Sequence, residues 1–221
     1  MHLIELFELI ENGENGQVEF KRKFSTAEKI AKEMIAFTNT RGGKLIFGVD
    51  DNRTVIGVES EKGEIELIDM AAKFYCDPAI EYDCDIINIH RRDVIVVDIR
   101  ESRQKPHRLV TQNGNGGNYN GTNGSGKVYI RIKDKSVLAS RETIKILERS
   151  NPDAPPLIFS LGTHEKFLLD YLSKNEQVTL NSFRSMLNLS QRRASRILVN
   201  LVRAELIRIH TSEGNDFYTL S

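Results

Sequence analysis

The sequence predicts an α+β protein in which a mixed β-sheet with flanking helices is followed by a second, smaller domain. Short apolar runs typical of strands alternate with amphipathic helical patterns throughout residues 1–150. Residues 151–160 contain three of the five prolines, a composition typical of a stiff linker. Residues 161–221 show short helical patterns and a terminal hairpin pattern. We therefore expect a main domain, a linker and a small domain at these boundaries.

Periodicity predicts the individual elements of the main domain. Apolar residues spaced as on one helix face predict helices over residues 2–11, from a cap at Ser25 or Thr26, over 64–74 and over 141–149. Alternating or continuous apolar runs predict strands over residues 17–21, 45–49, 54–58, 86–89, 94–99 and 128–132. The run 54–58 is close enough to 45–49 to pair with it as a hairpin. The run 94–97 is almost uniformly apolar, which predicts a central strand.

A Gly-Gly turn and an acidic pair enclose the strand 45–49. Gly42 and Gly43 precede it, and glycine tolerates positive φ and the close approach of another backbone or a ligand. Asp50 and Asp51 follow it, at a strand exit where functional residues are common. Asp-Asp before an asparagine is also ordinary turn chemistry, so both interpretations stay open.

One glycine-rich segment resembles a nucleotide-binding motif. Residues 113–126 are nearly all Gly, Asn, Ser and Thr, and they predict a long flexible loop. Within this loop, residues 121–127 spell most of a P-loop, which follows a strand, ends in Lys-Ser/Thr and opens a helix. Here Val128 replaces the Ser/Thr and begins a strand. We therefore do not expect ATP to bind through Lys127.

The small domain is predicted to be a winged helix-turn-helix. Its helices are expected over residues 165–172, 180–187 and 191–204, and its hairpin strands over 206–209 and 217–220. A connection of helix-turn-helix length, residues 187–190, joins the last two helices. Arg192, Arg193 and Arg196 lie outside the apolar face of the third helix, where a recognition helix contacts DNA. The alternative is a solvated helix face in a domain that binds other proteins.

The composition bounds the partners and the compartment. Of 221 residues, 39% are hydrophobic and 28% charged, and 31 basic side chains balance 31 acidic ones. This balance provides no overall attraction to nucleic acid or membranes, so any basic surface has to be local. No apolar run could span a bilayer, and no signal peptide is recognisable. We expect a cytoplasmic protein with reduced thiols at Cys76 and Cys84, no structural zinc site and no membrane partner.

Several separated motifs resemble one known family. They are Glu14 with residues 18–21, residues 36–43, residues 47–51, Ile56-Gly57, Ser102 with Lys105-Pro106-His107, and residues 128–131. In this order they resemble the Schlafen-type AlbA-like DNA-binding domain, also classed as a divergent AAA family, over residues 3–148. Bacterial members often carry a C-terminal winged helix. The insertion at 113–126 departs from the family pattern.

The resemblance implies two different activities. In bacterial members the domain is the nucleic-acid-binding part of a transcriptional regulator, whereas in animal Schlafen proteins it is an endoribonuclease whose acids bind a divalent metal. By motif position, those acids fall on Glu14, Glu19 and Asp51, with Asp50 as the alternate for the last. Clustered carboxylates hold Mg²⁺ or Mn²⁺, which can activate water at a phosphodiester.

The sequence as a whole favours a DNA-binding transcriptional regulator without catalytic activity. Its partner would be DNA, or RNA, and a homodimer is expected because winged helices commonly read two half-sites. We assign nucleic-acid contacts to Lys21 and Arg41 as well as to the three arginines of the third helix. The alternative is an endoribonuclease with catalytic, metal-binding acids and Mg²⁺ or Mn²⁺ as cofactor. The neutral net charge provides no broad RNA track, which favours the regulator.

Overall fold

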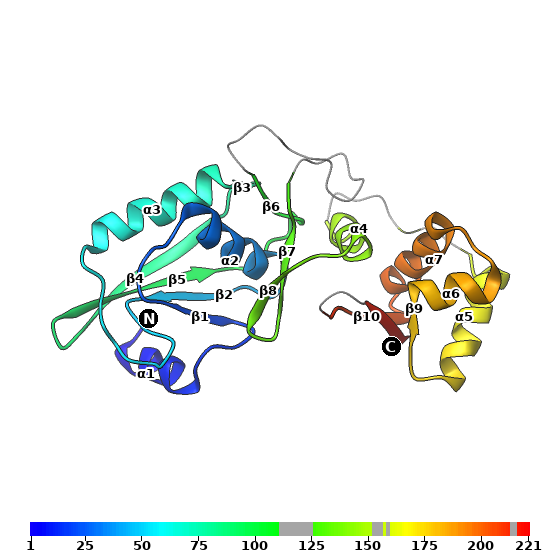
Figure 1. Cartoon of the computed structure of the whole chain (residues 1–221), viewed down its shortest axis with the longest axis horizontal. Coiled ribbons are helices and arrows are strands. Elements are labelled where there is room, and N and C mark those ends of the chain that lie inside the picture. Colours follow the sequence, from blue (N-terminus) through cyan, green and yellow to red (C-terminus); the bar gives the residue numbers. More distant parts are fainter. Residues whose placement is uncertain (111–125, 152–156, 158–159, 213–215) are drawn as a thin grey trace. The chain divides into compact units, whose positions relative to one another are not determined.

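The computed structural model describes residues 1–110, 126–151, 157, 160–212 and 216–221 (Figure 1). The chain divides into two compact units, Met1–Ala139 and Ser140–Ser221. The greater part of the predicted loop 113–126 and of the predicted linker 151–160 lies outside the described residues. Each unit has its own hydrophobic core.

The first unit is built on a four-stranded mixed sheet. Its strands lie in the order β1 (Val18–Lys21), β2 (Gly43–Phe47), β5 (Arg92–Ile99) and β4 (Tyr82–Ile89). β1 and β2 are parallel, whereas β5 runs antiparallel to both of its neighbours. The almost uniformly apolar run within β5 therefore lies in an inner strand, as its sequence predicts.

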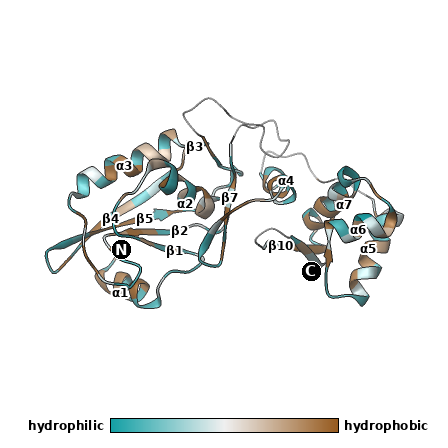
Figure 2. Cartoon of the chain, in the orientation of Figure 1, coloured by the Kyte–Doolittle hydropathy of each residue, from teal (hydrophilic) through white to brown (hydrophobic). Residues whose placement is uncertain are grey.

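Helices cover both faces of this sheet (Figure 1). α1 (Leu3–Asn12) packs on one face, and α2 (Ala27–Asn39) and α3 (Glu61–Phe74) pack on the other. Because successive side chains of a strand point to opposite faces, β2 contributes Leu45 to the core under α2 and Ile46 to the core under α1. The apolar residues of β2 and β5 are brown in Figure 2.

Two short antiparallel ladders complete the first unit. They pair β3 (Cys76–Asp77) with β6 (Arg108–Leu109), and β7 (Tyr129–Ile132) with β8 (Lys135–Leu138). The buried side chain of Asn39, at the end of α2, donates hydrogen bonds of 3.0 Å to the carbonyl oxygens of His107 and Tyr129. One amide thus joins α2 to two segments that are distant in the sequence.

The Gly-Gly turn that leads from α2 into β2 has room for no side chain. Gly42 has a φ of +70°, and a Cβ at this position would lie 2.5 Å from the carbonyl oxygen of Ile99. A Cβ on Gly43 would lie 2.3 Å from the Phe37 ring. Both glycines are therefore required by close packing, which is one of the uses the sequence suggests for them.

The expected hairpin between residues 45–49 and 54–58 is wrong. Residues 54–58 make only one β-bridge, between Val49 and Val55, and form no strand. The backbone N–H groups of Ile56 and Gly57 both donate to the carbonyl oxygen of Gly48 at 2.9 Å. Because both edges of β2 are already paired, with β1 and β5, no edge is left for a further strand.

The second unit combines helices with a small antiparallel sheet of strand order β10-β11-β9. Its elements are α4 (Arg141–Arg149), α5 (Thr163–Lys174), β9 (Val178–Thr179), α6 (Leu180–Leu187), α7 (Gln191–Arg203), β10 (Ile207–His210) and β11 (Phe217–Leu220). Leu168, Phe183, Leu198 and Tyr218 belong to its core. Among all described helices of the chain, none is long and apolar enough to cross a membrane.

Helix α4 belongs to the second unit, although the sequence places it in a main domain that ends at residue 150. The division falls after Ala139, and α4 packs against α7. Lys145 Nζ donates a hydrogen bond of 2.8 Å to Ser195 Oγ on α7. Ser195 and Val199 of α7 are buried outside the shared core of the other helices. Periodicity predicts that α4 is a helix, but it does not specify which surface the helix covers.

Candidate functional site

The three acids predicted as a catalytic set come from separate parts of the first unit. Glu14 precedes β1, Glu19 lies on β1, and Asp51 follows β2, the parallel neighbour of β1. Glu14 Oε1 accepts a hydrogen bond of 2.8 Å from the Phe20 backbone N–H. Partial burial raises the pKa of Glu14, and the charges of Glu19 and Asp51 raise it further, against the opposing effects of the Phe20 N–H and Lys21. Glu14 is thus close enough to Glu19 and to Asp51 to interact electrostatically with each of them.

Glu19 is held by two cations. Its Oε2 accepts a hydrogen bond of 3.0 Å from Arg131 Nη1, and its Oε1 pairs with Lys21 Nζ. The Arg131 side chain is only 1% exposed, and its Nη1 also lies 3.1 Å from Glu33 Oε2. Arg131 Nη2 donates a hydrogen bond of 2.8 Å to the carbonyl oxygen of Asn15. Two carboxylates therefore compensate this buried guanidinium.

Arg131 is a site residue for which the sequence provides only a weak signal. It interrupts an apolar strand between Ile130 and Ile132, and a charged side chain at a buried strand position requires partners. Its guanidinium carbon lies 4.6 Å from the centroid of the Phe37 ring, and Nη1 is 3.2 Å from Ser136 Oγ. The sequence can single out Arg131 as a charged residue in an apolar strand. It does not identify the acidic partners Glu19 and Glu33, which lie on β1 and α2 and meet β7 only in the folded chain.

This arrangement does not gather the predicted metal ligands around one cation position. Both carboxylate oxygens of Glu19 are occupied, by Arg131 and by Lys21. Within the described parts of the chain, no group of three or more His, Cys, Asp and Glu side chains is placed to hold a metal ion. Mg²⁺ and Ca²⁺ require several oxygen ligands at about 2.0–2.6 Å. The catalytic and metal-binding roles of Glu14, Glu19 and Asp51 stay predictions.

The alternate acid, Asp50, closes a turn. Its Oδ1 accepts a hydrogen bond of 3.0 Å from the Asp51 N–H, and its carbonyl oxygen accepts one of 2.7 Å from the Arg53 N–H. Its carboxylate lies 3.5 Å from an exposed Arg22 guanidinium. These bonds are the ordinary turn chemistry that the sequence allows for this acidic pair, whereas the Asp51 side chain is exposed.

The two basic residues assigned to the main domain differ in availability. Lys21 is paired with Glu19. Arg41 is exposed beside the Gly-Gly turn and lines a hollow of about 550 Å³ together with Lys44 and Arg100. Lys44 pairs with Asp98, whereas Arg41 forms no ion pair with any described residue. Arg41 is therefore the better placed of the two to meet an anionic ligand.

The three arginines of α7 form an exposed basic end of that helix. Arg192, Arg193 and Arg196 are exposed, and none of them forms an ion pair with a residue that the structure describes. Ser190 caps the helix by accepting a hydrogen bond of 3.3 Å from the Arg193 N–H. Asn188, with a φ of +49°, ends α6 in the left-handed conformation and turns the chain into α7. The positive end of the helix dipole adds to the charge of the three side chains.

Most of the P-loop-like stretch lies outside the described residues. At its end, the Leu109 N–H donates a hydrogen bond of 2.8 Å to the Lys127 carbonyl oxygen, and the Lys127 N–H donates one of 3.3 Å in return. Lys127 thus enters a β-bridge and is followed by β7, so no helix begins there. The helix N-terminus that a P-loop requires is absent at this position, while the absence of ATP binding stays a prediction.

Comparison with known proteins relates the first unit to a family. A family model described as Schlafen, AlbA_2 matches residues 14–140. An uncharacterized ATP-binding protein, UU034 of Ureaplasma parvum serovar 3, is 43% identical over 63 residues, which cover 25% of this chain and 18% of that protein. The chain thus matches less than a fifth of that relative's length.

Two solved structures are similar to parts of the chain. The DIP2311 protein from Corynebacterium diphtheriae is similar at a TM-score of 0.50 and 15% identity, over 86% of this chain and 35% of that one. The N-terminal domain of a protein from Nitrosomonas europaea, described as related to the ATP-dependent DNA helicase RecG, is similar at a TM-score of 0.40 and 21% identity, over 59% of this chain and 85% of that domain.

Proposed function

The chain belongs to the Schlafen, AlbA_2 family, and we propose that it binds nucleic acid as a cytoplasmic, DNA-binding transcriptional regulator. The observation that carries the proposal is the exposed arginine cluster at the start of α7, formed by Arg192, Arg193 and Arg196. Because the net charge of the protein is zero, attraction to the phosphates of a nucleic acid has to come from a local basic surface, and this cluster is such a surface.

We propose further that residues 161–221 form a winged helix-turn-helix. The order of α5, α6 and α7 with the β10-β11 hairpin supports this assignment, as does the short turn at Asn188 between α6 and α7. In such a domain the second helix of the motif enters the major groove with its N-terminal residues at the base edges. Here that helix would be α7, and those residues are the three arginines.

The assembly and the role of the first unit are part of the same proposal. Winged helices commonly read two half-sites, so the regulator is proposed to act as a homodimer, which light scattering at micromolar concentration tests directly. The exposed Arg41 beside the Gly-Gly turn supports a second contact with nucleic acid from the first unit.

The test is replacement of all three α7 arginines by alanine. Binding to a fluorescein-labelled DNA duplex is followed by fluorescence anisotropy over a range of salt concentrations. Each phosphate that the variant no longer neutralises should lower the slope of log K against log salt by about 0.9, because fewer counterions are released. The triple variant should therefore bind more weakly, and its slope of log K against log salt should be smaller in magnitude by up to about 2.7.

The matched control removes the same charge elsewhere on the surface. Lys29, Lys62 and Lys133 are exposed side chains of the first unit, outside the unit that contains α7. Their joint replacement by alanine should leave the salt slope unchanged. An α7 triple variant whose slope and affinity match those of the lysine variant would overturn the proposed DNA interface. Loss of a protein partner at unchanged DNA affinity would instead support a protein-interaction module.

A second candidate, a divalent-metal-dependent endoribonuclease, is favoured by the electrostatic coupling of Glu14 to Glu19 and to Asp51. The test is cleavage of structured RNA in the presence of Mn²⁺ or Mg²⁺. Glu19→Gln also alters the pair with Arg131, so the exposed Asp51→Asn is the cleaner variant. Cleavage by the wild-type protein that both variants abolish, at unchanged RNA binding, would replace the regulator proposal for this domain.

A further inference from the structure

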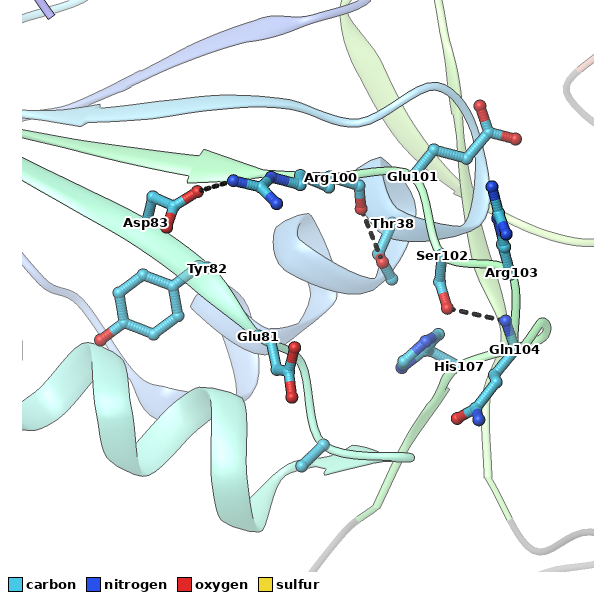
Figure 3. A pocket seen from close by; sticks show the side chains of 11 residues that line it. Thr38, Glu81, Tyr82, Asp83, Arg100, Glu101, Ser102, Arg103, Gln104 and His107 are labelled. Atoms are coloured by element: carbon cyan, nitrogen blue, oxygen red, sulfur yellow. Dashed lines mark hydrogen bonds and ion pairs between the residues drawn. The ribbon is translucent and has the colours of Figure 1, made fainter.

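A pocket of about 560 Å³ in the first unit contains none of the residues assigned above to catalysis, metal binding or nucleic-acid contact. Its wall comes from the end of α2, the start of β4 and the segment that follows β5 (Figure 3). Glu81, Tyr82, Ser102, Arg103 and His107 are among its lining residues. Its volume falls within the range of about 300–1,000 Å³ that is typical of small-molecule sites.

His107 brings a buried, unused hydrogen-bond acceptor to this pocket. Its side chain is 4% exposed, and its Nδ1 lies 2.7 Å from the carbonyl oxygen of Pro78. Because a carbonyl can only accept, Nδ1 carries the proton and Nε2 presents a lone pair. Nε2 has no hydrogen-bond partner among the described residues. Burial lowers the pKa of His107, which keeps the imidazole neutral and Nε2 an acceptor near neutral pH.

Hydrogen bonds fix the backbone of His107, while the contact of Nδ1 with the Pro78 carbonyl oxygen orients the ring. Its backbone N–H donates a hydrogen bond of 2.8 Å to Asn39 Oδ1, and its carbonyl oxygen accepts one of 3.0 Å from Asn39 Nδ2. Buried polar atoms in native proteins normally have partners, in the protein, in water or in a ligand. A ring that is held so firmly, with one nitrogen unpaired, points to a donor group that the protein itself does not supply.

The charges of the pocket identify the kind of donor. Asp83 pairs with Arg100 at 2.6 Å, and Glu101 pairs with Lys105 at 2.5 Å. Glu81 is exposed and forms no ion pair with a described residue. Figure 3 shows Glu81 next to the start of β4 and His107 on the segment that follows β5, and both line the pocket. An unpaired carboxylate and a neutral imidazole acceptor both suit a positively charged group with several N–H donors.

The remaining walls are consistent with a small ligand. The Tyr82 hydroxyl donates a hydrogen bond of 2.8 Å to Asp69 Oδ1, so its polar end is engaged within the protein. Arg103 is exposed and without an ion pair to any described residue, so it could meet an anionic end of the same ligand. The neutral amino group of a nucleobase would form no ion pair with Glu81.

We propose that this pocket binds a small molecule through its primary ammonium group, which donates hydrogen bonds to Glu81 and to Nε2 of His107. The ammonium group can belong to an amino acid or to an amine without a carboxylate. Arg103 would contribute to binding only in the first case. This inference does not rest on the nucleic-acid function proposed above.

The test is a thermal-shift and calorimetry screen of the full chain with the natural amino acids, linear diamines and ethanolamine. Matched diols, which lack the ammonium group, serve as ligand controls. An ammonium compound should bind at up to millimolar concentration, and Glu81→Gln should weaken its binding at least about tenfold, because the neutral amide of the variant cannot form an ion pair with the ammonium group. Glu59→Gln, at another exposed acid, should leave the affinity unchanged. Arg103→Ala then separates the two ligand types, since it weakens only amino acids.

A second measurement follows His107 itself. The imidazole ¹⁵N chemical shifts should show the proton on Nδ1 in the free protein and a change at Nε2 when the ammonium compound binds. Failure of every ammonium compound to bind, or equal binding by the Glu81→Gln and wild-type proteins, would overturn the proposal. Binding of a nucleoside or single-stranded oligonucleotide in place of the amines, abolished in Glu81→Gln, would overturn the ammonium assignment.

Discussion

Replacing Arg131 by methionine should destabilise the first unit severely. The side chain is 1% exposed and bonds two carboxylates, Glu19 at 3.0 Å and Glu33 at 3.1 Å, which are themselves 13% and 14% exposed. Breaking a buried ion pair by removing one partner costs about 3–5 kcal/mol, because the other charge stays buried without compensation. This is a large part of the roughly 5–15 kcal/mol that stabilises a typical domain.

Urea unfolding followed by far-ultraviolet circular dichroism measures this destabilisation, since the chain has no tryptophan to serve as a fluorescent probe. With a slope of about 1–3 kcal/mol per molar urea, the midpoint should fall by roughly 1–5 M. Arg100→Met is the control: that side chain is 81% exposed in its pair with Asp83, so its replacement should cost less than about 1 kcal/mol. An Arg131→Met midpoint equal to that of the control would refute the reasoning.

The double variant Arg131→Met with Glu33→Gln tests the physical cause. If uncompensated carboxylates produce the destabilisation, removing one of them should recover part of the stability, and the two substitutions should be non-additive. Strict additivity would show that packing of the arginine on Phe37, rather than its charge, dominates.

Three further outcomes are expected. The pKa of Glu14 is raised above 4.5 in the folded protein, chiefly by burial. The wild-type protein should therefore lose stability relative to Glu14→Gln as the pH rises through the folded-state pKa, and the difference in unfolding free energy between the two proteins should be smallest below pH 4.5. Unfolding curves of both proteins across this pH range measure that difference. Gly42→Ala should cost about 1–3 kcal/mol in urea unfolding because of its positive φ and its close approach to a backbone carbonyl, whereas Gly63→Ala, in helix α3, should be neutral or stabilising by up to about 1 kcal/mol. The fragment 140–221 should melt at a higher temperature than 161–221 because α4 covers buried residues of α7; equal melting temperatures would contradict the packing of α4.

The candidate sites differ in how well the sequence alone predicts them. The exposed arginines of α7 could be predicted because helical periodicity separates the apolar face of a helix from its polar face. The grouping of Glu14, Glu19 and Asp51 followed from family motifs, and the structure places Glu14 within electrostatic reach of each of the other two. Ser102 and His107 stand in one of these motifs, but no sequence signal shows that they share a pocket with Glu81, because its walls come from three separate segments.

Most helices and strands of the described chain could be predicted from the sequence, since the spacing of apolar side chains within a few residues specifies each of them. Which elements meet was visible only in the folded chain. In the folded chain both edges of β2 are occupied, so residues 54–58 form no strand beside it. Tertiary packing also brings α4 against α7 and Arg131 against Glu19, an acid 112 residues earlier in the chain. Such contacts depend on the path of the whole chain. A local sequence pattern predicts which face of an element is buried, but it does not predict which other element covers that face.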